Sequence, residues 1–289
     1  MSTTRTRRGE QQARSRREFL PHGKQRKERT KEQVARAAGG PFDFPANQVG
    51  VSGNVTVYYD PTLGTQGESL AKQLLNAVTG PYNDMQTFFG ITGSAVNVVI
   101  APLSGQNDGS GGAYHYGCDF AAGGTLYLDA TFANTTVDPL NLEIGLFIAE
   151  LSESFMGPQG GGWNCGFSNG EGLSRFCAEQ ETSPGTLDAF ATGPVWAQAG
   201  FPDWVTKTEP TDQDGVSTGC AIVYIYWLRS LGFTIPKIVQ AAGNTLSANY
   251  QTLTGKTSAY QDLLAAAKSA SPITSDNPFV TSGAAVRHR

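Results

Sequence analysis

The segment GLFIAELSESFMG, residues 145–157, carries two carboxylates whose spacing suits acid–base chemistry. Glu150 occupies the place of the general base in a helical HExxH motif, in which two histidines four residues apart bind zinc and the glutamate activates the metal-bound water. Here Ala149 and Glu153 fill the two histidine places. Alanine offers no ligand and glutamate offers oxygen where nitrogen is expected, so the sequence excludes a zinc site of the HExxH kind.

A third acidic side chain follows in SNGEGLSRFCAE, residues 168–179. Glu171 lies eighteen residues after Glu153, and Arg175 lies one helical turn beyond Glu171. On their own helix, Glu150 and Glu153 project together, away from the main apolar stripe. Because an unpaired buried carboxylate is costly, we expect the three glutamates to converge on one pocket and to be paired, protonated or bound to a cation.

Several groups could neutralise such a pocket. Arg175 can pair with Glu171 and bridge to the other helix, but one arginine leaves three carboxylates with excess negative charge. A raised pKa on one glutamate, a hydrated hard cation bound by Glu153 and Glu171, or a second basic group would balance the remainder. The candidate basic group is His115 in GGAYHYGCDF, the one histidine of the predicted folded region.

Two roles stay open for His115. It is either a hydrogen-bonded structural residue or part of a functional cleft with Tyr114, Tyr116 and the glutamates. With Cys118 it forms an HxxC pair, which gives a metal only two ligands, without a second pair at a fitting spacing. Trp163, between Gly162 and Asn164, either covers the pocket or packs within its loop.

The elements that must position these residues follow from the apolar spacing. Alternating or continuous β-branched residues predict strands, and apolar residues three and four apart predict helices. The helix that carries Glu150 is expected to begin at Asp138-Pro139, an N-cap residue followed by proline in the first turn. The predicted strands are residues 54–60, 95–103 and 125–132, the last as an edge strand, and the other predicted helices are residues 68–90, 219–233 and 235–255.

This order of elements resembles the N-terminal half of the gluzincin metallopeptidases, in which the N-E-G-x-[AS] start of a helix carries a glutamate as the third zinc ligand. NGEGLSR places Glu171 there. With AYHYGCDF and GGWNCGFSNGEGLSR, roughly residues 50 to 270 are similar to a group of bacterial proteins distantly related to gluzincins of the peptidase MA type. The resemblance implies a zincin-like α+β fold: a small mixed sheet with an edge strand packed on an active-site-type helix, then a helical C-terminal half.

Two functions follow as expectations. The first is a non-catalytic protein with a degenerate zinc site that binds a peptide or other polymer in a glutamate-lined cleft. The alternative is a hydrolase, a peptidase or glycosidase, in which Glu150 acts as general base. It would use either a non-zinc cation held by Glu153, Glu171 and His115, or an acid–base pair of carboxylates. No cofactor is predicted, zinc is not expected, and a hard divalent cation belongs only to the alternative.

Charge divides the chain of 289 residues into two parts. Residues 1–38 carry a net charge of +8 and almost no apolar side chains, which predicts a disordered basic tail. This tail is either a solvated extension or a segment that binds nucleic acid or another acidic surface. Residues 39–289 carry −12. We expect an N-terminal subdomain at residues 39–180, a helical subdomain at 181–272 and a flexible tail at 273–289.

The sequence leaves the compartment open. Residues 15–20 match the SRRxFL core of a twin-arginine export signal, but a basic stretch follows where a hydrophobic one is needed. No transmembrane segment is predicted, and we expect a cytoplasmic protein, with an extracellular one as the alternative. The cysteines allow either buried thiols or disulfides, with three pairings if all are bonded; they are Cys118, Cys165, Cys177 and Cys220.

Overall fold

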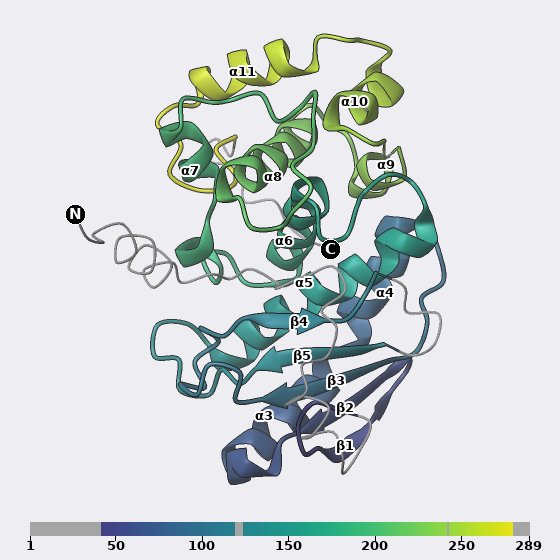
Figure 1. Cartoon of the computed structure of the whole chain (residues 1–289), viewed down its shortest axis with the longest axis vertical. Helices are drawn as coiled ribbons and strands as arrows, with labels where there is room; N and C mark the ends of the chain where they lie inside the picture. The colour runs from purple at the N-terminus through teal and green to yellow at the C-terminus, as the bar shows by residue number, and fades with distance from the viewer. Residues whose placement is uncertain (1–41, 119–123, 242, 280–289) are drawn as a thin grey trace, which may run out of the picture.

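The computed structural model describes residues 42–118, 124–241 and 243–279, which form a mixed α+β structure (Figure 1). A five-stranded sheet occupies the N-terminal half, and most of the C-terminal half is helical. The predicted α+β class is therefore confirmed. The strands are β1 (Asn47–Ser52), β2 (Val55–Tyr59), β3 (Val96–Ala101), β4 (Ala113–His115) and β5 (Thr125–Asp129).

The strand order across the sheet is β1-β2-β3-β5-β4. β2, β3 and β5 run parallel to one another, while β1 and β4 pair antiparallel at the two edges. The predicted strands 54–60 and 95–103 correspond to β2 and β3. The prediction of residues 125–132 as an edge strand is wrong, because β5 is paired on both sides. The edge strand is instead β4, in a glycine-flanked segment expected to be a loop.

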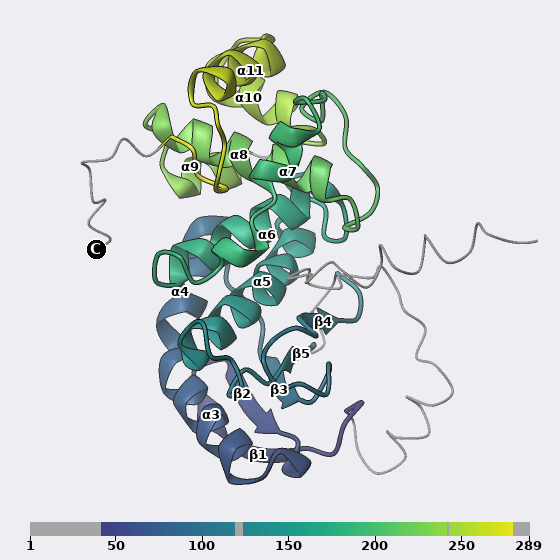
Figure 2. The same ribbon diagram turned by 90° about the vertical axis from the view of Figure 1, so that its left-hand side faces the viewer.

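Three helices cover one face of the sheet (Figure 2). They are α3 (Gly64–Ala77), α4 (Thr79–Phe89) and α5 (Pro139–Gln159). The single helix predicted over residues 68–90 is divided between α3 and α4, because Pro81 lacks the N–H that a continuous helix would need at this position. α5 begins as predicted: the Asp138 side chain accepts a hydrogen bond from the Asn141 backbone N–H, and Pro139 follows it.

The C-terminal half is built from shorter helices. The predicted helix 219–233 corresponds to α8, but the predicted helix 235–255 consists of two helices, α9 and α10. A new helix starts at Thr245, whose side chain accepts from the Ala248 backbone N–H and caps α10. The elements are α6 (Ser168–Glu181), α7 (Gly193–Gln198), α8 (Gly215–Ser230), α9 (Ile235–Gln240), α10 (Leu246–Thr254) and α11 (Ala259–Ser269), with short 3-10 helices η2 (Pro61–Leu63) and η3 (Asp188–Phe190).

One continuous hydrophobic core joins the two halves. It runs from the helix-covered face of the sheet through α5 and α6 to α8, where the rings of Phe176 and Tyr226 lie 4.9 Å apart. Residues 273–279, within the segment predicted as a flexible tail, also pack onto this half: Asp276 is buried and accepts hydrogen bonds from the backbone N–H groups of Thr192 and Gly193. The core therefore crosses the boundary expected at residue 180.

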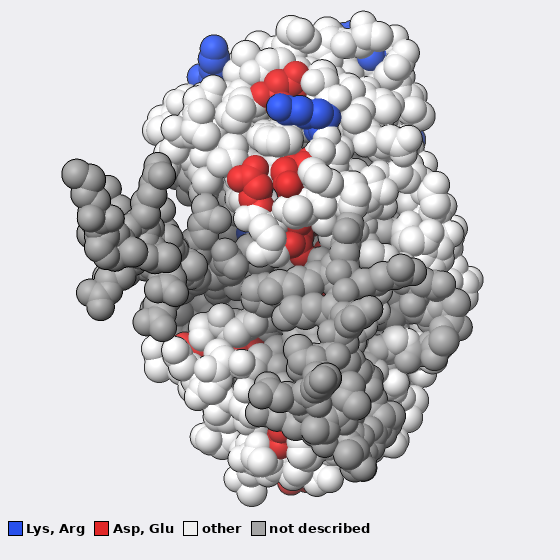
Figure 3. All heavy atoms as spheres, viewed as in Figure 1, with Lys and Arg blue, Asp and Glu red and all other residues white. Residues whose placement is uncertain are grey.

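The basic segment 1–38, its SRRxFL motif at residues 15–20 and residues 280–289 lie outside the described part of the chain. Within the described part, no helix has both the length and the apolar character needed to cross a membrane. On the face seen in Figure 3, Asp and Glu side chains gather over the helical half, and Lys and Arg side chains are few. This distribution agrees with the negative charge of residues 39–289.

Candidate functional site

The site is built around α5, which is apolar on nearly all sides and is therefore buried among the sheet, α4 and α6. This environment encloses the two glutamates of the helix. Glu150 and Glu153 are both 0 % exposed. Neither carboxylate lines an open cleft, contrary to the glutamate-lined cleft expected from the sequence.

The edge strand β4 supplies the histidine. Side chains alternate across a strand, so Ala113 and His115 face the helices while Tyr114 faces the other side of the sheet. His115 Nδ1 lies 2.6 Å from Glu150 Oε2, and His115 Nε2 lies 3.5 Å from Glu153 Oε2. The histidine thus contacts a glutamate at each ring nitrogen.

Burial dominates the electrostatics of these three groups. It lowers the pKa of His115, against the opposing effects of Glu153 and Asp212. It raises the pKa values of Glu150 and Glu153 well above the ordinary value of 4.5, and each is raised further by neighbouring carboxylates. Burial thus shifts the pKa values of Glu150 and His115 in the directions that favour the neutral form of each group.

Glu171 and Arg175 are hydrogen-bonded to each other within α6. Arg175 Nε donates to Glu171 Oε1 at 2.7 Å, and Arg175 Nη1 donates to the backbone oxygen of Phe190 at 2.8 Å. Burial raises the pKa of Glu171 to about 8, although Arg175 lowers it. The pairing with Glu171 agrees with the expectation from the sequence, and the hydrogen bond from Arg175 to Phe190 ties α6 to η3.

The three glutamates lie close enough to affect one another. Glu150 and Glu171 both raise the pKa of Glu153, and Glu150 raises that of Glu171. Each also keeps one buried oxygen without a hydrogen-bond partner among the described residues: Oε1 of Glu150, Oε1 of Glu153 and Oε2 of Glu171. A proton, a cation or an ordered water could satisfy these oxygens.

The sequence reasoning missed Asp212. Its carboxylate is 3 % exposed, accepts a hydrogen bond from Gln213 and raises the pKa values of all three glutamates. It lies in the loop between α7 and α8, far from the glutamates in the sequence. Only its place in an acidic loop could have drawn attention to it, and no spacing rule links that loop to α5.

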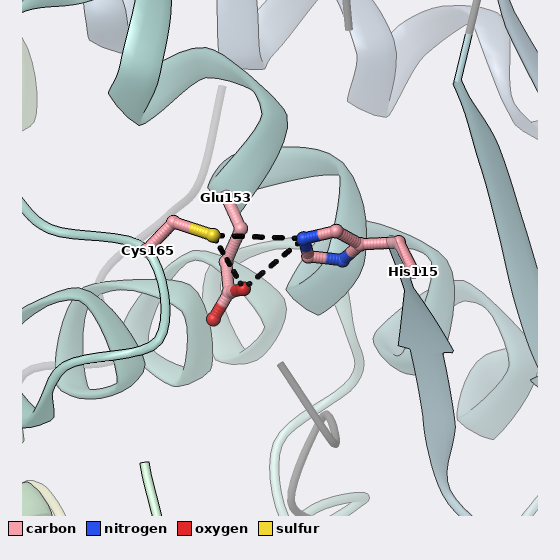
Figure 4. A group of neighbouring side chains, drawn as sticks. All are labelled: His115, Glu153 and Cys165. Atoms are coloured by element: carbon pink, nitrogen blue, oxygen red, sulfur yellow. Dashed lines mark hydrogen bonds and ion pairs between the residues drawn. The ribbon is translucent and has the colours of Figure 1, made fainter. Parts of the chain in front are cut away.

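The positions of possible metal ligands test the hypothesis that a hard cation binds at this site. Among the described residues, one group of three ligand side chains has its donor atoms within 4.8 Å of one another: His115, Glu153 and Cys165 (Figure 4). Glu171 does not belong to it. A hard cation bound jointly by Glu153, Glu171 and His115 therefore needs side-chain movement. Cys165 is itself bonded to Cys118 in a disulfide, whereas Cys177 and Cys220 are buried thiols.

The structure places Tyr114 and Tyr116 away from the glutamates. Their hydroxyls donate to Asp43 Oδ2, at 3.1 and 2.5 Å, on the face of the sheet opposite α5. The ring of Tyr114 stacks on Tyr127 with centroids 4.7 Å apart. The expectation that these tyrosines line a cleft with the glutamates is therefore wrong. Side chains alternate along β4, so the tyrosines lie on the face of the sheet opposite His115.

Trp163 lies beside an open space near the site. Its indole N–H donates to the backbone oxygen of Val239 at 2.9 Å, and its side chain is buried. It borders a surface pocket of about 330 Å³, which we call the Trp163 pocket. The lining residues are Cys118, Met156, Gly157, Gly160, Gly162, Trp163, Asn164, Cys165, Phe167 and Asn244.

The fold and site thus define an α+β protein with a buried histidine–carboxylate cluster beside a surface pocket. The chain matches no known protein family, no curated protein and no solved structure. Its function must therefore be argued from the site itself.

Proposed function

We propose that this chain is a non-catalytic binding protein of zincin-like architecture, and that the Trp163 pocket holds an uncharged stretch of a peptide or similar polymer. The zincin-like part of the proposal is supported by the order of elements. An antiparallel edge strand, β4, lies against the glutamate helix α5, and the NGEG helix α6 follows. The resemblance inferred from the sequence predicts an edge strand, a glutamate helix and then the NGEG helix, although it placed the edge strand at residues 125–132.

The observation that carries the proposal is the separation of the ionisable groups from the pocket. Among the described residues that line the pocket, none has an ionisable side chain, because Cys118 and Cys165 are joined in a disulfide. Glu150, Glu153 and His115, which could act as base or nucleophile activator, are at most 3 % exposed and contact one another. A ligand in the pocket therefore meets no general base among the residues that the structure describes.

The pocket chemistry suits a neutral polar chain. Asn164 and Asn244 offer amide donors and acceptors, and the glycine-rich rim at residues 157–162 lets backbone groups approach a ligand closely. Trp163 and Phe167 add apolar surface. Amide groups with aromatic rings recognise peptide bonds or hydroxyls without requiring charge on the ligand.

The test is binding to an array of short peptides, half of them uncharged and half carrying Lys or Asp, followed by fluorescence anisotropy on the positive spots. We expect uncharged peptides to bind. Asn244→Trp, at an exposed position, should fill the pocket and weaken binding by about tenfold or more. Asn76→Trp, an exposed substitution on α3 outside the pocket, is the matched control and should change nothing.

Two results would overturn the proposal. Binding that Asn244→Trp leaves unchanged would show that the ligand site lies elsewhere. Hydrolysis of peptides or glycans that disappears in Glu150→Gln would establish the hydrolase instead. The short His115–Glu150 contact is the observation that keeps this alternative worth measuring.

A further inference from the structure

The distances around Cys165 have the geometry of a zinc site. His115 Nε2 lies 3.6 Å from Cys165 Sγ, Cys165 Sγ lies 3.4 Å from Glu153 Oε2, and His115 Nε2 lies 3.5 Å from that oxygen (Figure 4). For tetrahedral zinc with ordinary bond lengths to nitrogen, oxygen and sulfur, ligand atoms are about 3.3–3.6 Å apart. The three donor atoms therefore already occupy three corners of such a tetrahedron.

The disulfide bears directly on this geometry. A sulfur bonded to another sulfur has no thiolate charge, and thiolate is the form of cysteine that binds metals. Its partner Cys118 lies three residues after His115 and completes an HxxC pair. Because the two sulfurs are bonded, both side chains reach the same place, and reduction would free a third and a fourth ligand together.

We propose that, once the Cys118–Cys165 disulfide is reduced, His115, Cys118, Glu153 and Cys165 bind one Zn²⁺ ion. A dithiol supplies two electrons and two protons: its own sulfurs close to a disulfide while the Cys118–Cys165 bond breaks to give two thiols. When zinc binds, the two thiols release their protons to solvent and ligate as thiolates. Cys118 must rotate away from Cys165 so that its sulfur takes the fourth corner.

The surroundings of His115 fit this role. Zinc-bound histidines commonly donate their other ring N–H to a carboxylate, which fixes the ring and its tautomer. Glu150 Oε2 already lies 2.6 Å from His115 Nδ1, the nitrogen that faces away from Glu153 and Cys165. Glu150 then acts as a positioning residue for the metal ligand.

Four protein ligands make a closed site with no open position for water or substrate, which is the structural kind of zinc site. The ligands come from β4, the segment after it, α5 and the segment before α6, so zinc would hold these elements together where the disulfide does so otherwise. An oxidising compartment would preserve the disulfide, and a reducing one would favour the zinc form. The zinc content of the native protein would thus report its compartment.

The experiment uses the full chain, oxidised or reduced with a dithiol under argon, mixed with Zn²⁺, desalted and analysed for metal. We expect one tightly bound zinc per chain only after reduction. Co²⁺ should replace zinc and show the thiolate-to-metal absorption and visible bands of a tetrahedral site with sulfur ligands. Equal metal content in both redox states, or a Co²⁺ spectrum without thiolate absorption, would overturn the proposal.

Variants assign the ligands. Glu153→Gln keeps the disulfide, so its fold can be checked in the oxidised state before reduction. It should weaken zinc binding at least tenfold, and Glu150→Gln should do so by about 10- to 100-fold. Cys118→Ser with Cys165→Ser should abolish binding, while Cys220→Ala, at a buried thiol outside the group, should keep it. Tight binding that persists in both Glu153→Gln and the double cysteine variant would exclude this site.

Discussion

Asp129 and Glu153 are both fully buried carboxylates beside the same sheet, but their surroundings differ. At the end of β5, Asp129 Oδ1 accepts from the Ser104 backbone N–H at 3.0 Å. Its Oδ2 accepts from the Ser104 hydroxyl at 2.8 Å and from the Gly111 backbone N–H at 3.0 Å. On α5, Glu153 Oε1 has no hydrogen-bond partner among the described residues.

The difference separates a structural carboxylate from one that needs an additional ligand. Asp129 has donors for both oxygens and fastens the loop after β3 to β5. Glu153 has only His115 Nε2, at 3.5 Å from Oε2, as a possible donor among the described residues, and the neighbouring carboxylates raise its pKa further. Buried acidity alone therefore does not distinguish the two carboxylates, whereas the number of donors around each one does.

Glu171 offers the largest expected effect, through pH. Burial raises the pKa of its carboxyl to about 8, so the folded chain keeps a proton that the unfolded chain loses near the ordinary value of 4.5. Such a group stabilises the fold below its unfolded pKa and loses this contribution as the pH rises toward its folded pKa. From this group we expect the free energy of unfolding, measured in urea, to fall by about 4 kcal/mol between about pH 5 and pH 8.

The control for this prediction is the pH dependence of the free energy of unfolding in the Glu171→Gln variant. This variant also removes the carboxylate that Arg175 Nε contacts, so its absolute stability is not informative. Its stability should decline less steeply with pH than that of the wild-type protein, by the amount that Glu171 contributes. Parallel slopes would mean that Arg175 keeps Glu171 ionised throughout and that the cluster holds fewer protons than the comparison with Asp129 suggests.

Asp129→Ala gives the next largest effect. The substitution leaves the backbone N–H groups of Ser104 and Gly111 without their acceptor, and we expect a loss of about 3 kcal/mol in the free energy of unfolding. Asp138→Ala, which removes the exposed N-cap of α5, is the reference and should cost about 1 kcal/mol. If the two substitutions lowered the free energy of unfolding equally, the hydrogen bonds of Asp129 would contribute no more to stability than an ordinary N-cap.

The helix start and the acidic residues of α5 could be predicted from sequence because these signals are local. Asp138-Pro139 marks the cap, and the 3.6-residue period places Glu150 and Glu153 on one side of the helix. His115 could not be placed in the same way. β4 is only three residues long and flanked by glycines, so its alternation is too short to read.

Long-range partners were beyond the reach of sequence patterns for a different reason. Asp212 approaches the glutamates because α8 packs on α6 and α7 packs on α8, and no spacing rule records that packing. Cys118 and Cys165 are separated by 47 residues, and four cysteines allow three pairings. The sequence therefore shows only the HxxC pair, His115 and Cys118. The structure shows that Glu153 and Cys165 lie beside it.

Glu153→Gln in the oxidised protein has the smallest expected effect on stability. It tests the difference between Glu153 and Asp129 most directly. If the buried carboxyl of Glu153 is protonated in the folded chain, a neutral amide of the same shape replaces a neutral acid. The free energy of unfolding, measured with a chelator present, should then change by less than about 1 kcal/mol. The matched substitution Asp129→Asn directs an amide N–H₂ at backbone donors and should cost about 2 kcal/mol. A large loss in Glu153→Gln alone would show that Glu153 is ionised and paired with a protonated His115, and a buried ion pair would then replace the neutral cluster.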